Sequence, residues 1–226
     1  MTYDDEWAGL PYRPADDCPA CQGAGFLHPR DGSWILYSRI VSCACLGGSV
    51  RVTDHTAAQT FETFVEVPGT EKALKAARQL ASGEAKFLWY LLYGGTGNGK
   101  THLARAIIRA VKDRKLEARM VLAADLFSQL REAMRDNRTD ELLRRYKDVG
   151  FLAIDDYGVE YGSDWEAAKF DELMTSRYAT AKPTVLVTNK NLEDLPPRVA
   201  SRFRDSVMAR AVHNGAPDFR PRLRGR

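Results

Sequence analysis

A glycine-rich octapeptide in the middle of the chain constrains the fold more than any other feature. Residues 94–101 read Gly-Gly-Thr-Gly-Asn-Gly-Lys-Thr and fit G-x-x-x-x-G-K-[ST] without a mismatch. The apolar run at 87–93 predicts a buried strand before it, and the stripe of Leu103, Ile107 and Val111 predicts a helix after it. Because glycines let successive backbone N–H groups point at one anion, this order predicts a loop that surrounds a phosphate group.

Each residue of the loop has an expected role toward ATP or ADP. Lys100 would contact the β- and γ-phosphates, and Thr101 would offer its hydroxyl to Mg²⁺. We expect His102 to pack at the start of the helix rather than to act in catalysis. The predicted nucleotide-binding residues are Phe64, Gly95, Thr96, Gly97, Asn98, Gly99, Lys100, Thr101 and His102. The alternative is a glycine turn with an incidental lysine. It does not explain why the complete motif lies between a predicted strand and a predicted helix.

A Mg²⁺-nucleotide site also needs a carboxylate on a neighbouring strand. The sequence Phe-Leu-Ala-Ile-Asp-Asp at 151–156 supplies one after four apolar residues, which is a Walker B pattern. Asp155 would hold Mg²⁺ through its water shell, and Asp156 would orient or deprotonate the attacking water. Taken alone, the pattern is equally typical of a strand that runs into a solvated turn. Many ATPases carry Glu at the second position, so the shorter Asp156 predicts slow hydrolysis.

Asn189 follows the predicted strand at 184–188. Its amide would reach the γ-phosphate or the attacking water if that strand lies between the two Walker strands. The alternative is an ordinary turn asparagine.

The remaining pattern predicts an α/β fold. Short apolar runs at 120–123, 151–154, 184–188 and 207–212 alternate with helical patterns at 73–81, 126–134, 163–179 and 197–205. Such alternation favours a parallel sheet covered by helices on both faces. The longest apolar run has seven residues, whereas a membrane span needs roughly 20. The acidic start does not resemble a secretory signal, so we expect a cytoplasmic protein without a membrane partner.

All four cysteines lie near the N-terminus and form two pairs. Cys18 and Cys21 are separated from Cys43 and Cys45 by twenty-one residues. Two such pairs predict a tetrahedral Zn²⁺ site, with unpaired structural thiols as the alternative. We therefore predict a zinc-binding module at 1–53 and a second domain at 54–226 that ends in a short basic tail.

The order of motifs resembles a known family. The P-loop, Asp155-Asp156 and Thr188-Asn189 are followed by Leu-Pro-Pro-Arg-Val-Ala-Ser-Arg-Phe at 195–203. This combination is similar to the DnaA/DnaC branch of AAA+ ATPases, and within it to DnaC-type helicase loaders and IstB transposition helpers. The resemblance covers about 54–220. It implies a five-stranded parallel sheet of order 5-1-4-3-2 with no full C-terminal lid.

The resemblance also implies a trans-acting arginine. In that family the arginine of the Ser-Arg-Phe element projects into the next subunit's nucleotide, which makes Arg202 the candidate and self-assembly into an ATP-dependent oligomer the requirement. Arg198 is the competitor, and a solvated arginine is the alternative for either. Arg220 is a weaker candidate for a second sensor of the nucleotide.

The same resemblance suggests the partners. A zinc knuckle that ends in C-x-C is similar to DnaI-like loaders, so the expected function is delivery of a hexameric replicative helicase onto DNA. Arg144, Arg145 and the tail at 220–226 are candidates for contact with single-stranded DNA. Two alternatives stay open: an IstB-like helper of a transposase, and an adaptor that binds nucleotide without hydrolysing it.

Overall fold

The computed structural model describes residues 18, 26–27, 30–31, 34–35, 41–42, 45, 59–158 and 163–219. The chain divides into two compact units, Met1–Asp54 and His55–Arg226. In the first unit, four two-residue strands pair antiparallel. They are β1 (Phe26–Leu27) with β4 (Val41–Ser42), and β2 (Arg30–Asp31) with β3 (Trp34–Ile35).

The predicted zinc site lies largely outside this description. Cys18 and Cys45 are partly buried, whereas Cys21 and Cys43 fall outside the described residues. Within the described part of the chain, no three His, Cys, Asp or Glu side chains are grouped to hold a metal ion. The four-cysteine zinc site therefore stays a prediction.

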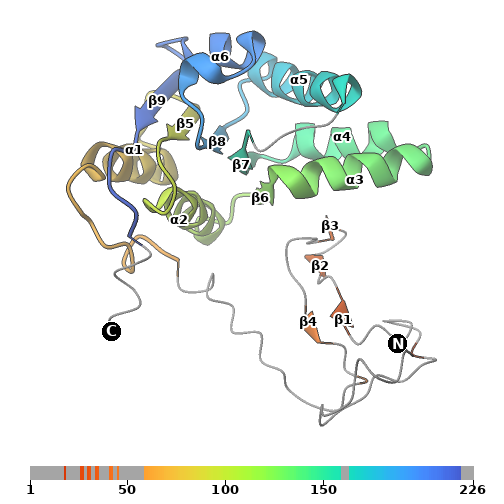
Figure 1. The fold of residues 1–226 in the computed structure, drawn as a ribbon, viewed down its shortest axis with the longest axis horizontal. Coiled ribbons are helices and arrows are strands. Elements are labelled where there is room, and N and C mark those ends of the chain that lie inside the picture. Colours follow the sequence, from red (N-terminus) through yellow and green to blue (C-terminus); the bar gives the residue numbers. More distant parts are fainter. Residues whose placement is uncertain are drawn as a thin grey trace, which may run out of the picture. The chain divides into compact units, whose positions relative to one another are not determined.

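The second unit is built on one parallel sheet, and the predicted α/β fold is confirmed. Its strands are β5 (Trp89–Tyr93), β6 (Ala118–Leu122), β7 (Phe151–Tyr157), β8 (Thr184–Thr188) and β9 (Ala209–His213). They follow the order β6-β7-β8-β5-β9, and every neighbouring pair is parallel (Figure 1). Counted along this unit, that is the predicted order 5-1-4-3-2. Strand β8 therefore lies between β5 and β7.

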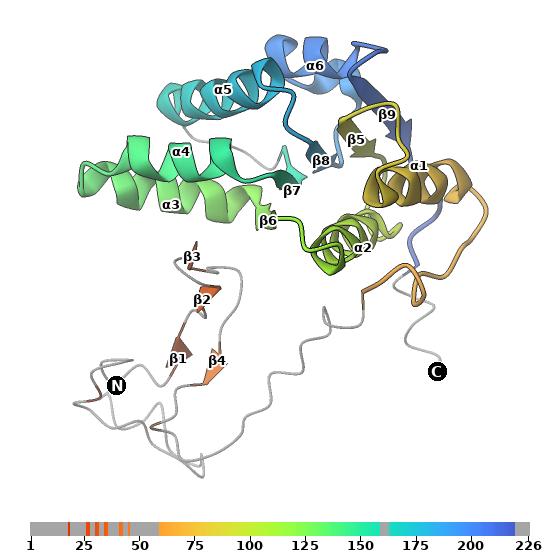
Figure 2. The same cartoon turned by 180° about the vertical axis from the view of Figure 1, so that it is seen from behind.

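Helices cover both faces of this sheet. They are α1 (Glu71–Ser82), α2 (Lys100–Asp113), α3 (Ala123–Arg135), α4 (Thr139–Asp148), α5 (Asp164–Ala179) and α6 (Pro197–Phe203), with a short 3₁₀ turn η2 (Leu192–Asp194) before α6. Figure 2 shows α1 beside α2, and α5 beside α6 on the other side of β5. In the part of the chain that the structure describes, no helix is long and apolar enough to cross a membrane.

Strand β5 shows why both faces are covered. The ring of Trp89 packs on Tyr178 of α5 and Phe203 of α6, with ring centroids 5.4 and 5.3 Å away. The next residue, Tyr90, points to the opposite face and donates its hydroxyl to the carbonyl of Ala73 in α1 at 3.0 Å. Successive side chains of a strand alternate between faces, so an unbroken apolar run needs helices on both.

Helix α4 was not predicted. It buries only Leu143 and Tyr146, and two apolar positions give no periodic stripe. Its charges follow the helix dipole, with Asp140 and Glu141 in the first turn and basic residues in the last. Other element ends differ from the expected positions by a few residues.

Candidate functional site

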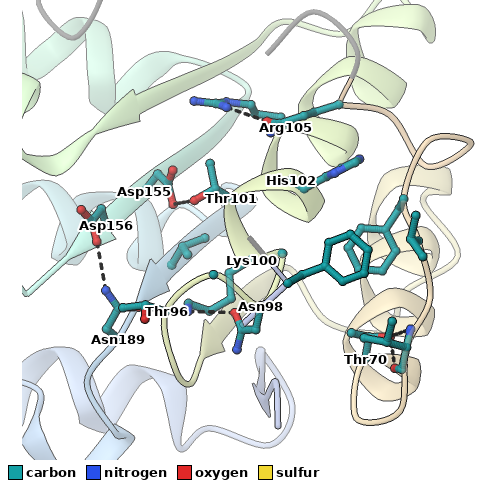
Figure 3. A pocket seen from close by; sticks show the side chains of 18 of the residues that line it. Thr70, Thr96, Asn98, Lys100, Thr101, His102, Arg105, Asp155, Asp156 and Asn189 are labelled. Atoms are coloured by element: carbon teal, nitrogen blue, oxygen red, sulfur yellow. Dashed lines mark hydrogen bonds between the residues drawn. The ribbon is translucent and has the colours of Figure 1, made fainter. Parts of the chain in front are cut away.

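The carboxyl ends of the central strands open into a cavity of about 580 Å³. Figure 3 shows side chains that line it, contributed by the loop after β5, the start of α2, the ends of β7 and β8, and the segment before α1. Of the predicted site residues, those that line the cavity are Phe64, Thr96, Gly97, Asn98, Gly99, Lys100, Thr101, His102, Asp155, Asp156 and Asn189. Gly95 and Arg202 do not line it.

Two glycines give the loop its shape. Gly97 and Gly99 have φ values of 68° and 91°, a region that residues with a Cβ rarely adopt. Space is also restricted, because a Cβ on Gly99 would lie 2.8 Å from the ring of Phe64. Helix α2 begins at the next residue, and its first turn carries no acidic side chain. The positive end of the helix dipole therefore faces the loop.

The ammonium group of Lys100 is held inside this loop. It donates to the carbonyl oxygen of Gly94 at 2.9 Å, to the carbonyl oxygen of Gly95, and to the side-chain oxygen of Asn98 at 3.1 Å. These acceptors are uncharged oxygens, so they position the ammonium without neutralising it. Gly95 therefore helps to position Lys100 through its carbonyl, although it does not line the cavity.

Thr101 and Asp155 meet across the cavity floor. The hydroxyl of Thr101 donates to Asp155 Oδ1 at 3.2 Å, which joins the start of α2 to β7 (Figure 3). Burial raises the pKa of the Asp155 carboxyl above its ordinary value, while the Thr101 hydrogen bond and the charge of Arg105 act in the opposite direction. A hydroxyl and a buried carboxylate side by side are oxygen donors that suit Mg²⁺, so the residues present fit this ion.

Asp156 lies beside Asn189, as the strand order requires. The pairing of β7 with β8 becomes irregular between Ile154 and Tyr157, and Asp156 has a φ of 55°. This bend points the side chains of the two consecutive aspartates in different directions. Asp155 is therefore buried, whereas Asp156 is exposed. The amide of Asn189 donates to Asp156 Oδ1 at 3.3 Å. Asn189 was predicted to reach the site only if its strand lies between the P-loop strand and the Asp155 strand. Strand β8 does lie between β5 and β7, so this condition is met.

The cavity has contributors that sequence reasoning missed. They are Gln59, Thr63, Val65, Val67, Thr70, Arg105, Leu122, Val187 and Phe219. Arg105 is one helical turn beyond Thr101, so i, i+4 spacing would have placed it on the same face. Its guanidinium donates to Gln59, which fixes the segment before α1 onto α2. The apolar members near Phe64 form a non-polar wall at one side of the cavity.

The C-terminal segment packs onto the phosphate-binding loop. Asn98 and Asn214 are both buried and donate reciprocally, each amide to the other's backbone carbonyl, at 2.8 and 2.9 Å. The N–H of Phe219 donates to the carbonyl of Gly97 at 3.0 Å. A Cβ on Gly97 would overlap the carboxylate of Asp218, so any larger residue at this position would displace that side chain.

The comparison with protein families decides the classification. Residues 56–210 match the bacterial DnaA ATPase domain. The chain belongs to this family. DnaA, the chromosomal replication initiator of Brucella abortus biovar 1, is 30% identical over an alignment of 233 positions that covers 93% of this chain and 46% of that protein. The replicative helicase loader DnaC of Escherichia coli K12 is 30% identical over 152 residues, 66% of this chain and 62% of DnaC. The chain thus spans about half the length of the DnaA relatives.

Solved structures share the fold. DnaA from Aquifex aeolicus with bound AMPPCP superposes with a TM-score of 0.64 at 21% identity, over 74% of this chain and 55% of that one. The DnaC helicase loader gives 0.58 at 24% identity, over 71% of this chain and 99% of that one. DnaI gives 0.60 at 22% identity, over 72% and 91%. The second unit therefore has the α/β fold of these proteins, and its match at residues 56–210 makes it an ATPase domain of the DnaA family.

Proposed function

We propose that this chain is an ATP-dependent loader that delivers a hexameric replicative helicase onto DNA. The observation that carries the proposal is the convergence of Lys100, Thr101, Asp155, Asp156 and Asn189 in one cavity of a DnaA-family domain. The 30% identity to the replicative helicase loader DnaC, over 62% of that protein, supports the loader role.

The P-loop side of the cavity would bind the phosphates. Backbone N–H groups at Gly97 and Gly99 and the start of α2 would hold them, and Lys100 would exchange its loop oxygens for the β- and γ-phosphate oxygens. Thr101 and Asp155 would hold Mg²⁺. The ion would supply positive charge against the developing charge on the phosphates. The apolar wall near Phe64 suits the flat face of a base.

Hydrolysis would depend on the polar pair at the edge of the cavity. Asp156 is exposed and would orient or deprotonate the attacking water, while Asn189 fixes the carboxylate through its amide. The side chain of aspartate is one methylene shorter than that of glutamate and would hold the attacking water less well. ATP hydrolysis would therefore be slow. Slow turnover suits a timed release of partners better than continuous motion.

A neighbouring subunit would complete the site. Within the part of the chain that the structure describes, neither Arg198 nor Arg202 lines the cavity of its own subunit. A guanidinium supplied in trans raises the rate of phosphoryl transfer about 10³- to 10⁵-fold in comparable enzymes. Arg202 would have this role here. ATP would thereby hold adjacent subunits together on single-stranded DNA, and hydrolysis would release them.

The N-terminal unit would bind one Zn²⁺ through Cys18, Cys21, Cys43 and Cys45 and dock onto the helicase. Metal analysis of freshly reduced protein should find one zinc per chain. A protein without zinc would refute the metal site but not the ATPase.

A paired experiment tests the loader function. The wild-type chain, mixed with the hexameric helicase of its own organism, ATP and a single-stranded DNA circle, should increase the amount of helicase bound to DNA. Asp156→Asn should retain nucleotide binding and helicase binding while hydrolysis and release stop. Asp140→Asn, on the exposed start of α4, serves as the control and should behave as wild type.

Two outcomes would contradict parts of the proposal. Unchanged turnover in Asp156→Asn would refute the water-activating role of Asp156 but not the loading of a helicase. Capture of a transposase in place of the helicase, lost with Cys18→Ser, would establish the IstB-like alternative.

A further inference from the structure

Two arginines of α6 converge on a single carboxylate of α5. Arg202 Nη1 lies 3.0 Å from Asp171 Oδ1, and Arg198 Nη1 lies 3.0 Å from Asp171 Oδ2. Helices α5 and α6 lie side by side in both ribbon views (Figures 1 and 2). Asp171 therefore binds both arginines that compete for the role of the trans-acting group.

The two arginines are held to different degrees. The guanidinium of Arg202 also donates to the carbonyl of Arg198 at 2.8 Å and to the hydroxyl of Thr175, and its side chain is 15% exposed. The side chain of Arg198 is 81% exposed. Arg202 thus has a fixed and largely covered position, whereas Arg198 is mainly solvated.

The charge of the cluster is suited to an anion. Burial raises the pKa of Asp171, but the hydrogen bonds and charges of Arg198 and Arg202 outweigh it and hold the pKa below its usual range. The carboxylate is therefore ionised at neutral pH. Two guanidinium groups and one carboxylate give a net charge of 2 − 1 = +1. A simple one-to-one ion pair would be neutral and would not attract a phosphate group.

We propose that Asp171 is a positioning residue that holds Arg202 ready for the nucleotide of the adjacent subunit. This inference rests on the proposed function, which assigns Arg202 to that nucleotide. A long arginine side chain samples many rotamers, and a reaction that needs one of them is faster when that rotamer is fixed in advance. Arg198 satisfies the second carboxylate oxygen and keeps the cluster positive.

Mixed assemblies test the inference. A donor subunit carries Lys100→Ala, so it binds no ATP and contributes only its arginine. An acceptor subunit carries Arg202→Ala, so it binds ATP and lacks the arginine. Neither hydrolyses alone, and their mixture should recover activity at the acceptor sites.

Asp171→Ala is then introduced on one side at a time. In the donor it should lower kcat roughly ten- to a hundredfold with an unchanged KM for ATP, because the arginine is no longer prepositioned. In the acceptor it should change nothing. Asp171→Glu in the donor should recover part of the rate. Glu172→Gln in the donor is the matched control, because this neighbouring carboxylate pairs with Lys147 and Lys169 instead.

The outcomes distinguish the trans-acting role of Arg202 from the positioning role of Asp171. A mixture of the parental donor and acceptor that stays inactive would refute the trans-acting Arg202, and the inference with it. A mixture that recovers but tolerates Asp171→Ala in the donor, or becomes faster, would overturn the inference alone. Equal losses with the substitution on either side would also overturn it, since they would show a general effect on folding.

Discussion

At the residue scale, Arg177 is the most completely buried charge in the described part of the chain. It has no exposed surface, and it donates to the carbonyls of Tyr146, Val149 and Pro183 at 2.9, 2.7 and 2.7 Å and to the hydroxyl of Thr184 at 2.9 Å. Burial lowers its pKa to about 10, so it stays charged at neutral pH. One side chain thereby joins the end of α4 to the starts of β7 and β8.

Arg177→Met should lower the free energy of unfolding by about 3 kcal/mol, because several buried acceptors lose their donor at once. Urea unfolding measures the change. Arg135→Met, on the exposed side of α3, is the control and should change stability little. Equal losses in the two variants would contradict the structural role of Arg177.

Some site residues were predictable and others were not, for a physical reason. Lys100 and Thr101 belong to a local motif whose spacing alone determines their positions. Asp171 has no such pattern, because its arginine partners are 27 and 31 residues away. Asn214 meets Asn98 across 116 residues. Local spacing carries no information about contacts that only the folded sheet creates.

At the element scale, His102 holds the segment before α1 onto α2, together with the contact of Arg105 with Gln59. His102 Nε2 lies 2.7 Å from the carbonyl of Thr60, and its ring packs edge-on against Phe64 with centroids 5.2 Å apart. Burial lowers the pKa of His102, Arg105 lowers it further, and the Thr60 hydrogen bond partly opposes them. The folded state therefore favours the neutral imidazole.

The burial of His102 predicts a pH dependence of stability. Because the pKa of His102 is lower when folded than when unfolded, its contribution to stability is present above about pH 6.5 and is lost as the pH falls through the folded pKa. Stability should therefore decrease more between pH 7.5 and 5.5 in wild type than in His102→Gln. Urea unfolding at both pH values measures this, and an identical decrease would contradict it.

The elements themselves differ in how far sequence reveals them. The start of α5 was predictable, since the hydroxyl of Ser163 accepts from the N–H of Glu166 at 3.3 Å as the capping-box spacing indicates. The strands β5 to β9 were predictable from their apolar runs, whereas the two-residue strands β1 to β4 were not predicted. Helix α4 was not, because it buries few side chains and is stabilised by packing on α3 and α5. Amphipathic periodicity detects only helices with a broad apolar face.

At the scale of the whole molecule, the segment that follows the sheet of the second unit packs against the candidate nucleotide site. The segment 214–219 follows the last strand and returns to the P-loop, where Asn98 and Asn214 bind each other and Phe219 lines the cavity. Formation of the cavity therefore depends on the complete sheet.

Asn214→Ala should weaken nucleotide binding about tenfold, since its amide holds the segment that carries Phe219 and a buried hydrogen bond is worth roughly 1 kcal/mol or more. Hydrogen exchange at 214–219 should become faster at the same time. Asn191→Ala is the control, because this exposed amide donates to Asp194 at the surface and does not hold the segment that carries Phe219. Unchanged exchange and affinity in Asn214→Ala would contradict the coupling.

The most direct test concerns the phosphate-binding loop on which every assignment depends. A titration of the full chain with a fluorescent ATP analogue and Mg²⁺ should give saturable binding in wild type and in Lys112→Ala, an exposed lysine near the end of α2. Lys100→Ala should abolish it, because the only ammonium group lining the cavity among the described residues is lost. Binding of equal affinity in Lys100→Ala would contradict the account.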